Sequence, residues 1–95
     1  MILFENRSPP TSITISLDKD ADGGIRLSGH DIGQAPKDAF GSDDYEYWID
    51  ISAEGLRPLL EVMLADKYRD RPCAVSEFRA FCEQHDLPHQ FRSWP

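Results

Sequence analysis

The spacing of the apolar residues changes at Ser52. Before Ser52, apolar residues recur at every second position, as in residues 11–17 and 45–51, which is typical of half-buried β-strands. After Ser52, they recur at every third or fourth position, which is typical of amphipathic helices. A chain with strands first and helices after them is predicted to be α+β. We expect a small, mostly antiparallel sheet of three to four strands, covered by two C-terminal helices.

The first half of the chain is predicted to form a β-hairpin and then a further strand. Residues 11–17 and 25–27 alternate apolar and polar side chains, and residues 18–24 between them have the acidic and glycine content of a turn. Residues 29–36 combine glycine with proline and are predicted to form a flexible loop, and residues 35–40 are predicted to form one short helical turn that ends at Gly41. The next strand follows, where aromatic and β-branched residues are densest.

The second half of the chain is predicted to form two helices. The first helix has Ser52 as its expected N-cap, and Pro58 is expected to bend or delay its first turns. Pro72 ends this segment, and Ser76 is the expected N-cap of the second helix. Residues 89–94 are interpreted as a candidate last strand of the sheet.

The chain has 95 residues and a mass of 10.8 kDa, which is the usual size of one domain. We therefore expect a single domain over residues 1–95. No apolar run is long enough to cross a bilayer, and the first residues lack the pattern of a signal peptide, so we expect a cytoplasmic protein without membrane contact. In that reducing compartment, Cys73 and Cys82 are expected to stay as thiols.

Negative charge is concentrated in the middle of the chain. The formal net charge is −7, and the eleven acids and four bases from Asp18 to Glu61 account for all of it. This balance argues against binding to a phosphate backbone, so no nucleic-acid partner is expected. It indicates a basic protein partner, or an acidic surface that serves only solubility.

Two groups of residues resemble metal ligands, but neither has the full pattern of a metal site. Asp18, Asp20 and Asp22 match the first positions of a calcium loop, whereas Gly29 stands where that loop needs a glutamate. We favour solvated acids in a hairpin turn, and the sequence leaves calcium binding open. The candidate zinc ligands have the wrong spacing for a zinc finger; they are Cys73, Cys82, His85 and His89. No metal and no cofactor is therefore expected.

A small enzyme is one alternative function. His30 beside Asp31, together with His85 or His89, would supply a histidine base oriented by a carboxylate. No nucleophile elbow, phosphate-binding loop, dinucleotide fingerprint or zinc-protease motif accompanies these residues. A chain this short also leaves little room for a deep pocket beside its core. We therefore expect a non-enzymatic protein and assign no catalytic residue.

A tryptophan among carboxylates marks the strand that is best suited to bind a partner. If the tyrosines and isoleucines of residues 45–51 face the core, the alternate residues project from the other face of the strand. Tryptophan is a frequent interface anchor, and acids around it would steer a basic partner. In the alternative, Trp48 packs beneath the second helix and the acids only surround it, since either face of this strand can be the covered one. The predicted partner-binding residues are Asp43, Asp44, Glu46, Trp48 and Asp50.

Three short strings resemble a family of short, mostly uncharacterised bacterial proteins. They are Leu-Ser-Gly-His-Asp-Ile-Gly at residues 27–33, Phe-Gly at 40–41 and Tyr-Glu-Tyr-Trp at 45–48, and the similarity covers roughly residues 13–93. Some members resemble immunity proteins of contact-dependent inhibition and related polymorphic toxin systems. The resemblance implies a cytoplasmic protein that binds and neutralises a cognate toxin domain, often a nuclease.

The same resemblance suggests structural roles for the residues in these strings. Gly29, Asp31, Gly33 and the Phe-Gly pair would hold the turn before the aromatic strand, and Asp31 would cap the short helix. Immunity proteins vary most where they contact their toxins, so no contact residue is transferred to this chain. The remaining alternative is a general acidic adaptor or a nucleic-acid mimic that binds another basic protein.

Overall fold

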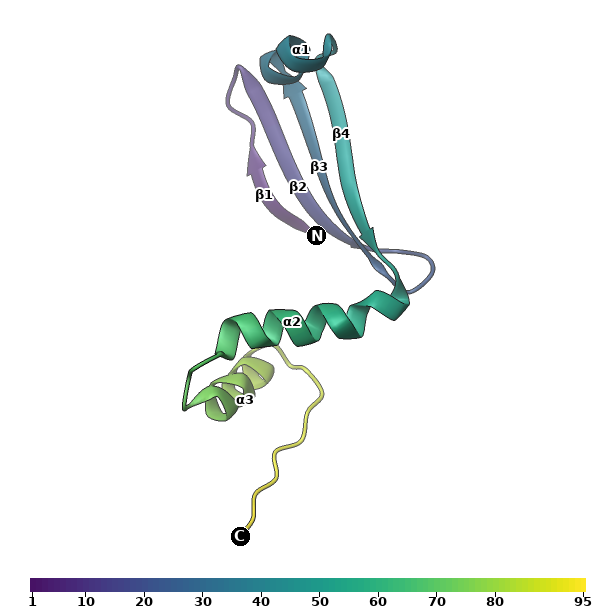
Figure 1. The fold of residues 1–95 in the computed structure, drawn as a ribbon. Coiled ribbons are helices and arrows are strands. Elements are labelled where there is room, and N and C mark those ends of the chain that lie inside the picture. The colour runs from purple at the N-terminus through teal and green to yellow at the C-terminus, as the bar shows by residue number, and fades with distance from the viewer. The chain divides into compact units, whose positions relative to one another are not determined.

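A computed structural model describes residues 1–95 and contains strands, then helices, in the order that the apolar spacing predicts. The elements are β1 (Ile2–Asn6), β2 (Thr11–Lys19), β3 (Ile25–Gly33), α1 (Gln34–Phe40), β4 (Asp44–Ile51), a 3₁₀ turn (Ala53–Gly55), α2 (Leu56–Tyr68) and α3 (Ala74–Gln84). The strands form one antiparallel sheet in the order β1-β2-β3-β4, with β1 and β4 at its two edges (Figure 1). The predicted α+β class, with a four-stranded antiparallel sheet and two C-terminal helices, is confirmed.

The chain divides into two compact units, Met1–Leu59 and Leu60–Pro95. The first unit holds the sheet, α1 and the start of α2, and the second holds the rest of α2 together with α3. The expectations that the C-terminal helices cover the sheet and that residues 1–95 form a single domain stay predictions.

The β2–β3 hairpin is confirmed and is longer than the sequence suggested. The two strands pair without interruption from Thr11 opposite Gly33 to Lys19 opposite Ile25. Between them, the Asp20 N–H donates to the carbonyl oxygen of Gly24 over 2.9 Å, which closes the turn. Gly23 has a φ of 87°, in the left-handed region where glycine carries no steric cost.

The prediction of a loop that starts at residue 29 is wrong, because β3 runs through to Gly33. Gly29 lies directly opposite Tyr47 of β4, and a Cβ atom at Gly29 would lie 2.2 Å from Cζ of the Tyr47 ring. The ring therefore lies against the backbone of Gly29, and the glycine makes room for an aromatic neighbour within the sheet. The Tyr47 hydroxyl donates to Oδ1 of Asp31 over 3.0 Å and fixes the ring in this position.

We expect Tyr47→Phe to lower the free energy of unfolding by roughly 1 kcal/mol near neutral pH, because the hydrogen bond to Asp31 is lost. Burial, and then the hydrogen bond to Asp31, raises the pKa of Tyr47 above its ordinary value of 10.0. Because the folded state favours the neutral Tyr47 hydroxyl, this group stabilises the fold fully at a pH below its unfolded-state pKa. The stabilisation is lost as the pH rises through its folded-state pKa. Urea unfolding from about pH 8 upward should therefore show the gap between wild type and variant narrowing above pH 10. Tyr45→Phe, on the same strand and face, is the control, and an equal loss in both variants would contradict the assignment.

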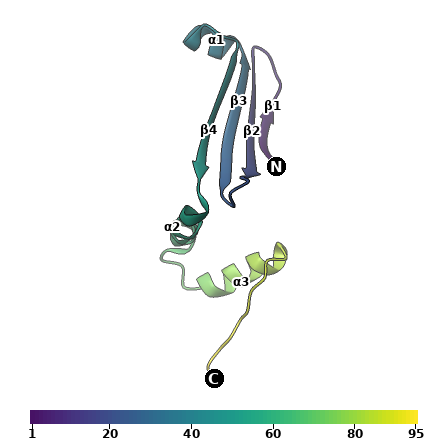
Figure 2. The same cartoon turned by 90° about the vertical axis from the view of Figure 1, so that its right-hand side faces the viewer.

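The short helix α1 ends as predicted, at Gly41, which has a φ of 77° and donates its N–H to the Lys37 carbonyl. Figure 1 and Figure 2 both show α1 at the end of the sheet where β3 ends and β4 begins. The predicted capping role of Asp31 is wrong, because Gly33 occupies the N-cap position and the Ala35 N–H of the first turn donates to the Thr11 hydroxyl over 3.0 Å. Asp31 instead accepts the hydrogen bond from Tyr47 within the sheet.

In the second unit, Tyr68 of α2 meets Phe78 of α3 edge-on, with ring centroids 5.7 Å apart. Cys82 of α3 is buried, at 3% exposure. Neither α2 nor α3 is long and apolar enough to cross a membrane.

The two predicted helix caps and the predicted C-terminal strand turn out differently. Ser52 is the N-cap residue of the 3₁₀ turn that precedes α2, and Pro58 lies in the first turn of α2, where its missing N–H breaks no helical hydrogen bond. Ser76 does not cap α3, because the helix already begins at Ala74. Residues 89–94 form no strand.

Candidate functional site

Four of the five predicted partner-binding residues lie along one face of β4, at an edge of the sheet. Asp44, Glu46, Trp48 and Asp50 occupy alternate positions of the strand, so their side chains share one face. Asp43 directly precedes the strand. All five residues are exposed, and Trp48, the largest of them, is 56% exposed.

Strand β3 adds four further residues to this polar face through its pairing with β4. Arg26 lies opposite Asp50, Ser28 opposite Trp48, His30 opposite Glu46, and Ile32 opposite Asp44. Residues that lie directly opposite in an antiparallel pair project to the same side of the sheet. The opposite side carries alternate apolar residues of β2, β3 and β4, among them Ile13, Ile15, Leu17, Leu27, Tyr45, Tyr47 and Ile49.

Arg26, Asp50 and Trp48 form a compact contact on the polar face. The Arg26 guanidinium donates two hydrogen bonds to the Asp50 carboxylate, over 2.6 and 3.0 Å, and its Cζ lies 5.2 Å from the centre of the Trp48 ring. This hydrogen bonding lowers the pKa of Asp50 and raises the pKa of Arg26. Sequence reasoning gave Asp50 the same role as the other acids, but its charge is compensated by Arg26. The acids that give this surface its negative character are therefore Asp43, Asp44 and Glu46.

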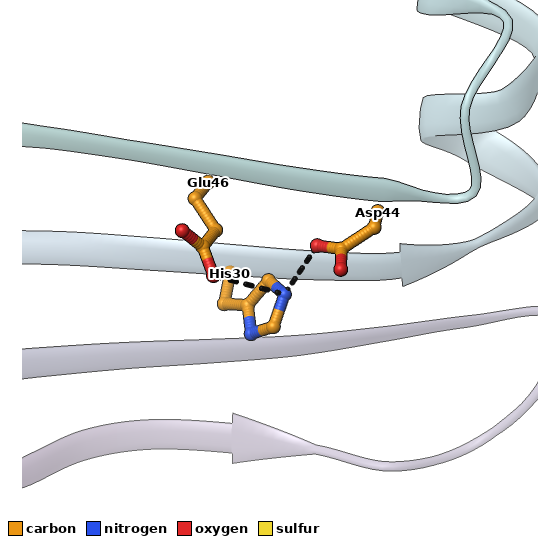
Figure 3. Close-up of side chains that lie close together, drawn as sticks. All are labelled: His30, Asp44 and Glu46. Atoms are coloured by element: carbon orange, nitrogen blue, oxygen red, sulfur yellow. Dashed lines mark hydrogen bonds and ion pairs between the residues drawn. The ribbon is translucent and has the colours of Figure 1, made fainter.

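The second contact on this face is the His30 cluster, which consists of His30, Asp44 and Glu46 (Figure 3). Nε2 of His30 lies 2.5 Å from Oδ1 of Asp44 and 3.8 Å from Oε1 of Glu46. Figure 3 shows both carboxylates directed toward the imidazole ring from β4. One ligand atom from each residue lies within 4.8 Å of the other two, so the cluster has the donor set and the spacing to hold a metal ion.

His30 and Asp31 do not form the pair that the enzyme alternative needs. They are consecutive residues of β3, so their side chains project to opposite faces of the sheet. Asp31 is hydrogen-bonded to Tyr47, while His30 meets Asp44. The other two histidines lie in the second unit. His85 packs against Phe81 with ring centroids 4.4 Å apart, and Nδ1 of His89 lies 2.7 Å from the Leu87 carbonyl oxygen.

The other metal candidates from the sequence do not assemble into a site of this kind. Oδ1 of Asp18 accepts a hydrogen bond from the N-terminal amino group over 3.2 Å, and the acids around it belong to a β-hairpin, without the flanking helices of a calcium-binding EF-hand. Cys73 is exposed and Cys82 is buried within α3, and both are free thiols. The cysteines and histidines of the second unit form no group with converging ligand atoms.

No family model, curated protein or solved structure matches the chain. The resemblance to short bacterial proteins and to immunity proteins stays a prediction. Sequence reasoning found the β4 side of the polar face from its alternation, but it missed Arg26 and His30 as members, because only the pairing of the strands brings them there.

Proposed function

We propose that this chain is an immunity protein that binds and neutralises a cognate toxin domain through the polar face of β3 and β4. One observation carries the proposal: Trp48 is 56% exposed at the centre of an edge strand, with carboxylates on the same face on both sides of it. Tryptophan is enriched in protein-binding hot spots, and charges around it steer the partner during association. The binding takes place in the cytoplasm, and the chain itself transforms no substrate.

The partner is basic, because this face carries negative charge. Asp43, Asp44 and Glu46 carry negative charge that no arginine or lysine of the chain neutralises through an ion pair, whereas Asp50 is paired with Arg26. Exposed acids attract a cationic surface over about one Debye length, roughly 8 Å at physiological salt, and raise the association rate. A nuclease toxin is cationic where it holds phosphate, and an acidic inhibitor fits that surface.

The test is affinity capture from extracts of the native host, with the wild-type chain and an Asp43→Lys, Asp44→Lys, Glu46→Lys variant as matched baits. We expect the wild type to retain a basic protein in a one-to-one complex. Expressed alone, this protein should be toxic, and co-expression of the wild-type chain should remove the toxicity. The variant should associate roughly 10-fold or more slowly at low salt, with a weaker salt dependence.

Three results would contradict the proposal. Capture of an acidic partner would remove the electrostatic argument, and equal association rates for both baits would exclude this face. Capture of a non-toxic basic protein would favour the acidic adaptor instead. Circular dichroism of the variant should match the wild type, because all three substituted residues are exposed.

A further inference from the structure

The His30 cluster brings a histidine of β3 together with two carboxylates of β4, the first of them 14 residues further along the chain. His30 lies directly opposite Glu46 in the β3–β4 pairing, and Asp44 is two residues from Glu46 on the same face. The imidazole is therefore placed between two carboxylates of the neighbouring strand. We propose that this cluster is a binding site for a divalent transition-metal ion, with Zn²⁺ as the reference ion.

The distances within the cluster are close to those of a zinc site. Bonds of 2.0–2.2 Å in a tetrahedral zinc site place neighbouring ligand atoms about 3.4 Å apart. Nε2 of His30 is 3.8 Å from Oε1 of Glu46 and 2.5 Å from Oδ1 of Asp44. To reach the zinc geometry, the distance to Glu46 must shorten slightly and the distance to Asp44 must lengthen by about 1 Å. Side-chain rotations are sufficient for both changes, because the side chains of Asp44 and Glu46 are 59% and 65% exposed.

The charges at the cluster favour a cation. Asp44 and Glu46 place two carboxylates on one face, and neither forms an ion pair with a lysine or arginine, since Arg26 is engaged by Asp50. A divalent ion would neutralise both carboxylates. A metal ion binds Nε2 of His30 through its lone pair, so the ring of the metal-bound form is neutral and carries its proton on Nδ1.

The ligand types favour a transition metal over calcium or magnesium. One imidazole nitrogen with two carboxylate oxygens suits Zn²⁺ and its neighbours in the series, whereas Ca²⁺ takes six to eight oxygen ligands and Mg²⁺ six oxygen ligands. Three protein ligands leave the fourth position of a tetrahedral ion open, and water can reach it because the His30 side chain is itself 37% exposed. The cluster shares Asp44 and Glu46 with the proposed partner-binding face, but Zn²⁺ binding is tested without any partner.

The experiment is calorimetric titration of the untagged full chain with Zn²⁺ alone, and separately with Mg²⁺. We expect about one equivalent of Zn²⁺ to bind and no heat from Mg²⁺. His30→Asn and Asp44→Asn should each weaken Zn²⁺ binding at least about 10-fold, the size of effect seen when groups that support metal ligands are removed. Asp43→Asn is the matched control for lost charge, and His89→Asn is the control for a histidine outside the cluster.

Absence of Zn²⁺ binding by the wild type would overturn the proposal. Equal weakening in Asp43→Asn and Asp44→Asn would also overturn it, because general charge attraction would then explain the binding. Loss of the bound equivalent in His89→Asn would place the ion elsewhere. Circular dichroism of each variant establishes that it is folded, so that lost binding reports on the ligand that was removed.

Discussion

The Trp48→Ala variant is expected to lose most of its affinity for the captured partner. Trp48 is 56% exposed, and the Arg26 guanidinium covers part of its ring from within the chain. Truncation of a hot-spot tryptophan costs about 2 kcal/mol or more, which is roughly a 30-fold or larger increase in Kd. The loss should appear in the dissociation rate, because the steering charges remain in place. Surface plasmon resonance with the purified partner measures both rates.

Trp94→Ala is the matched control for this variant. Trp94 is even more exposed, at 97%, but it lies beyond α3 in the C-terminal segment and outside the polar face. We expect its substitution to leave the Kd within about twofold of wild type, since most contacts outside a hot spot are nearly neutral. If the two substitutions weaken binding equally, or if Trp48→Ala binds as tightly as the wild type, the polar face of β3 and β4 is not the interface.

Replacement of Gly33 by alanine is expected to give the largest loss of stability of any single substitution proposed for the sheet. Gly33 has a φ of 132°, which L-residues rarely adopt, and an added Cβ would lie 2.1 Å from the Pro10 carbonyl oxygen. That oxygen accepts a hydrogen bond from the Gln34 N–H over 3.0 Å, so it cannot move away without losing this bond. Backbone strain and overpacking together predict a loss of about 3 kcal/mol and a fall in Tm on the order of 15 °C.

Gly41→Ala separates the two causes of this loss. Gly41 also has a positive φ, of 77°, but no atom lies within 4 Å of the position that a Cβ would take. Its substitution should cost only the left-handed strain, about 1 kcal/mol. Chemical unfolding of both variants measures the difference in the free energy of unfolding. If Gly33→Ala loses no more stability than Gly41→Ala, the close approach to the Pro10 carbonyl oxygen does not destabilise the variant.

The elements that the sequence predicted well are those with a strong local pattern. The alternation of residues 45–51 and the turn composition of residues 18–24 locate β4 and the hairpin, because each depends on neighbouring residues alone. Strand β1 was missed, since its five residues carry no clear alternation and gain their structure by pairing with β2. The stretch at residues 29–33 looked like a loop because of its glycines, but Gly29 is there to accommodate Tyr47.

The sequence alone determined the α+β class and the set of β4 side chains that share a face, because both follow from the period of the apolar residues. Only the tertiary structure decided which residues those side chains meet. Arg26 lies 24 positions before Asp50 and His30 lies 14 positions before Asp44, and the register of β3 against β4 brings each pair into contact. A shift of that register by one residue would turn every β3 side chain to the other face of the sheet. The ion pair beside Trp48 and the His30 cluster are therefore products of strand pairing, which local sequence does not encode.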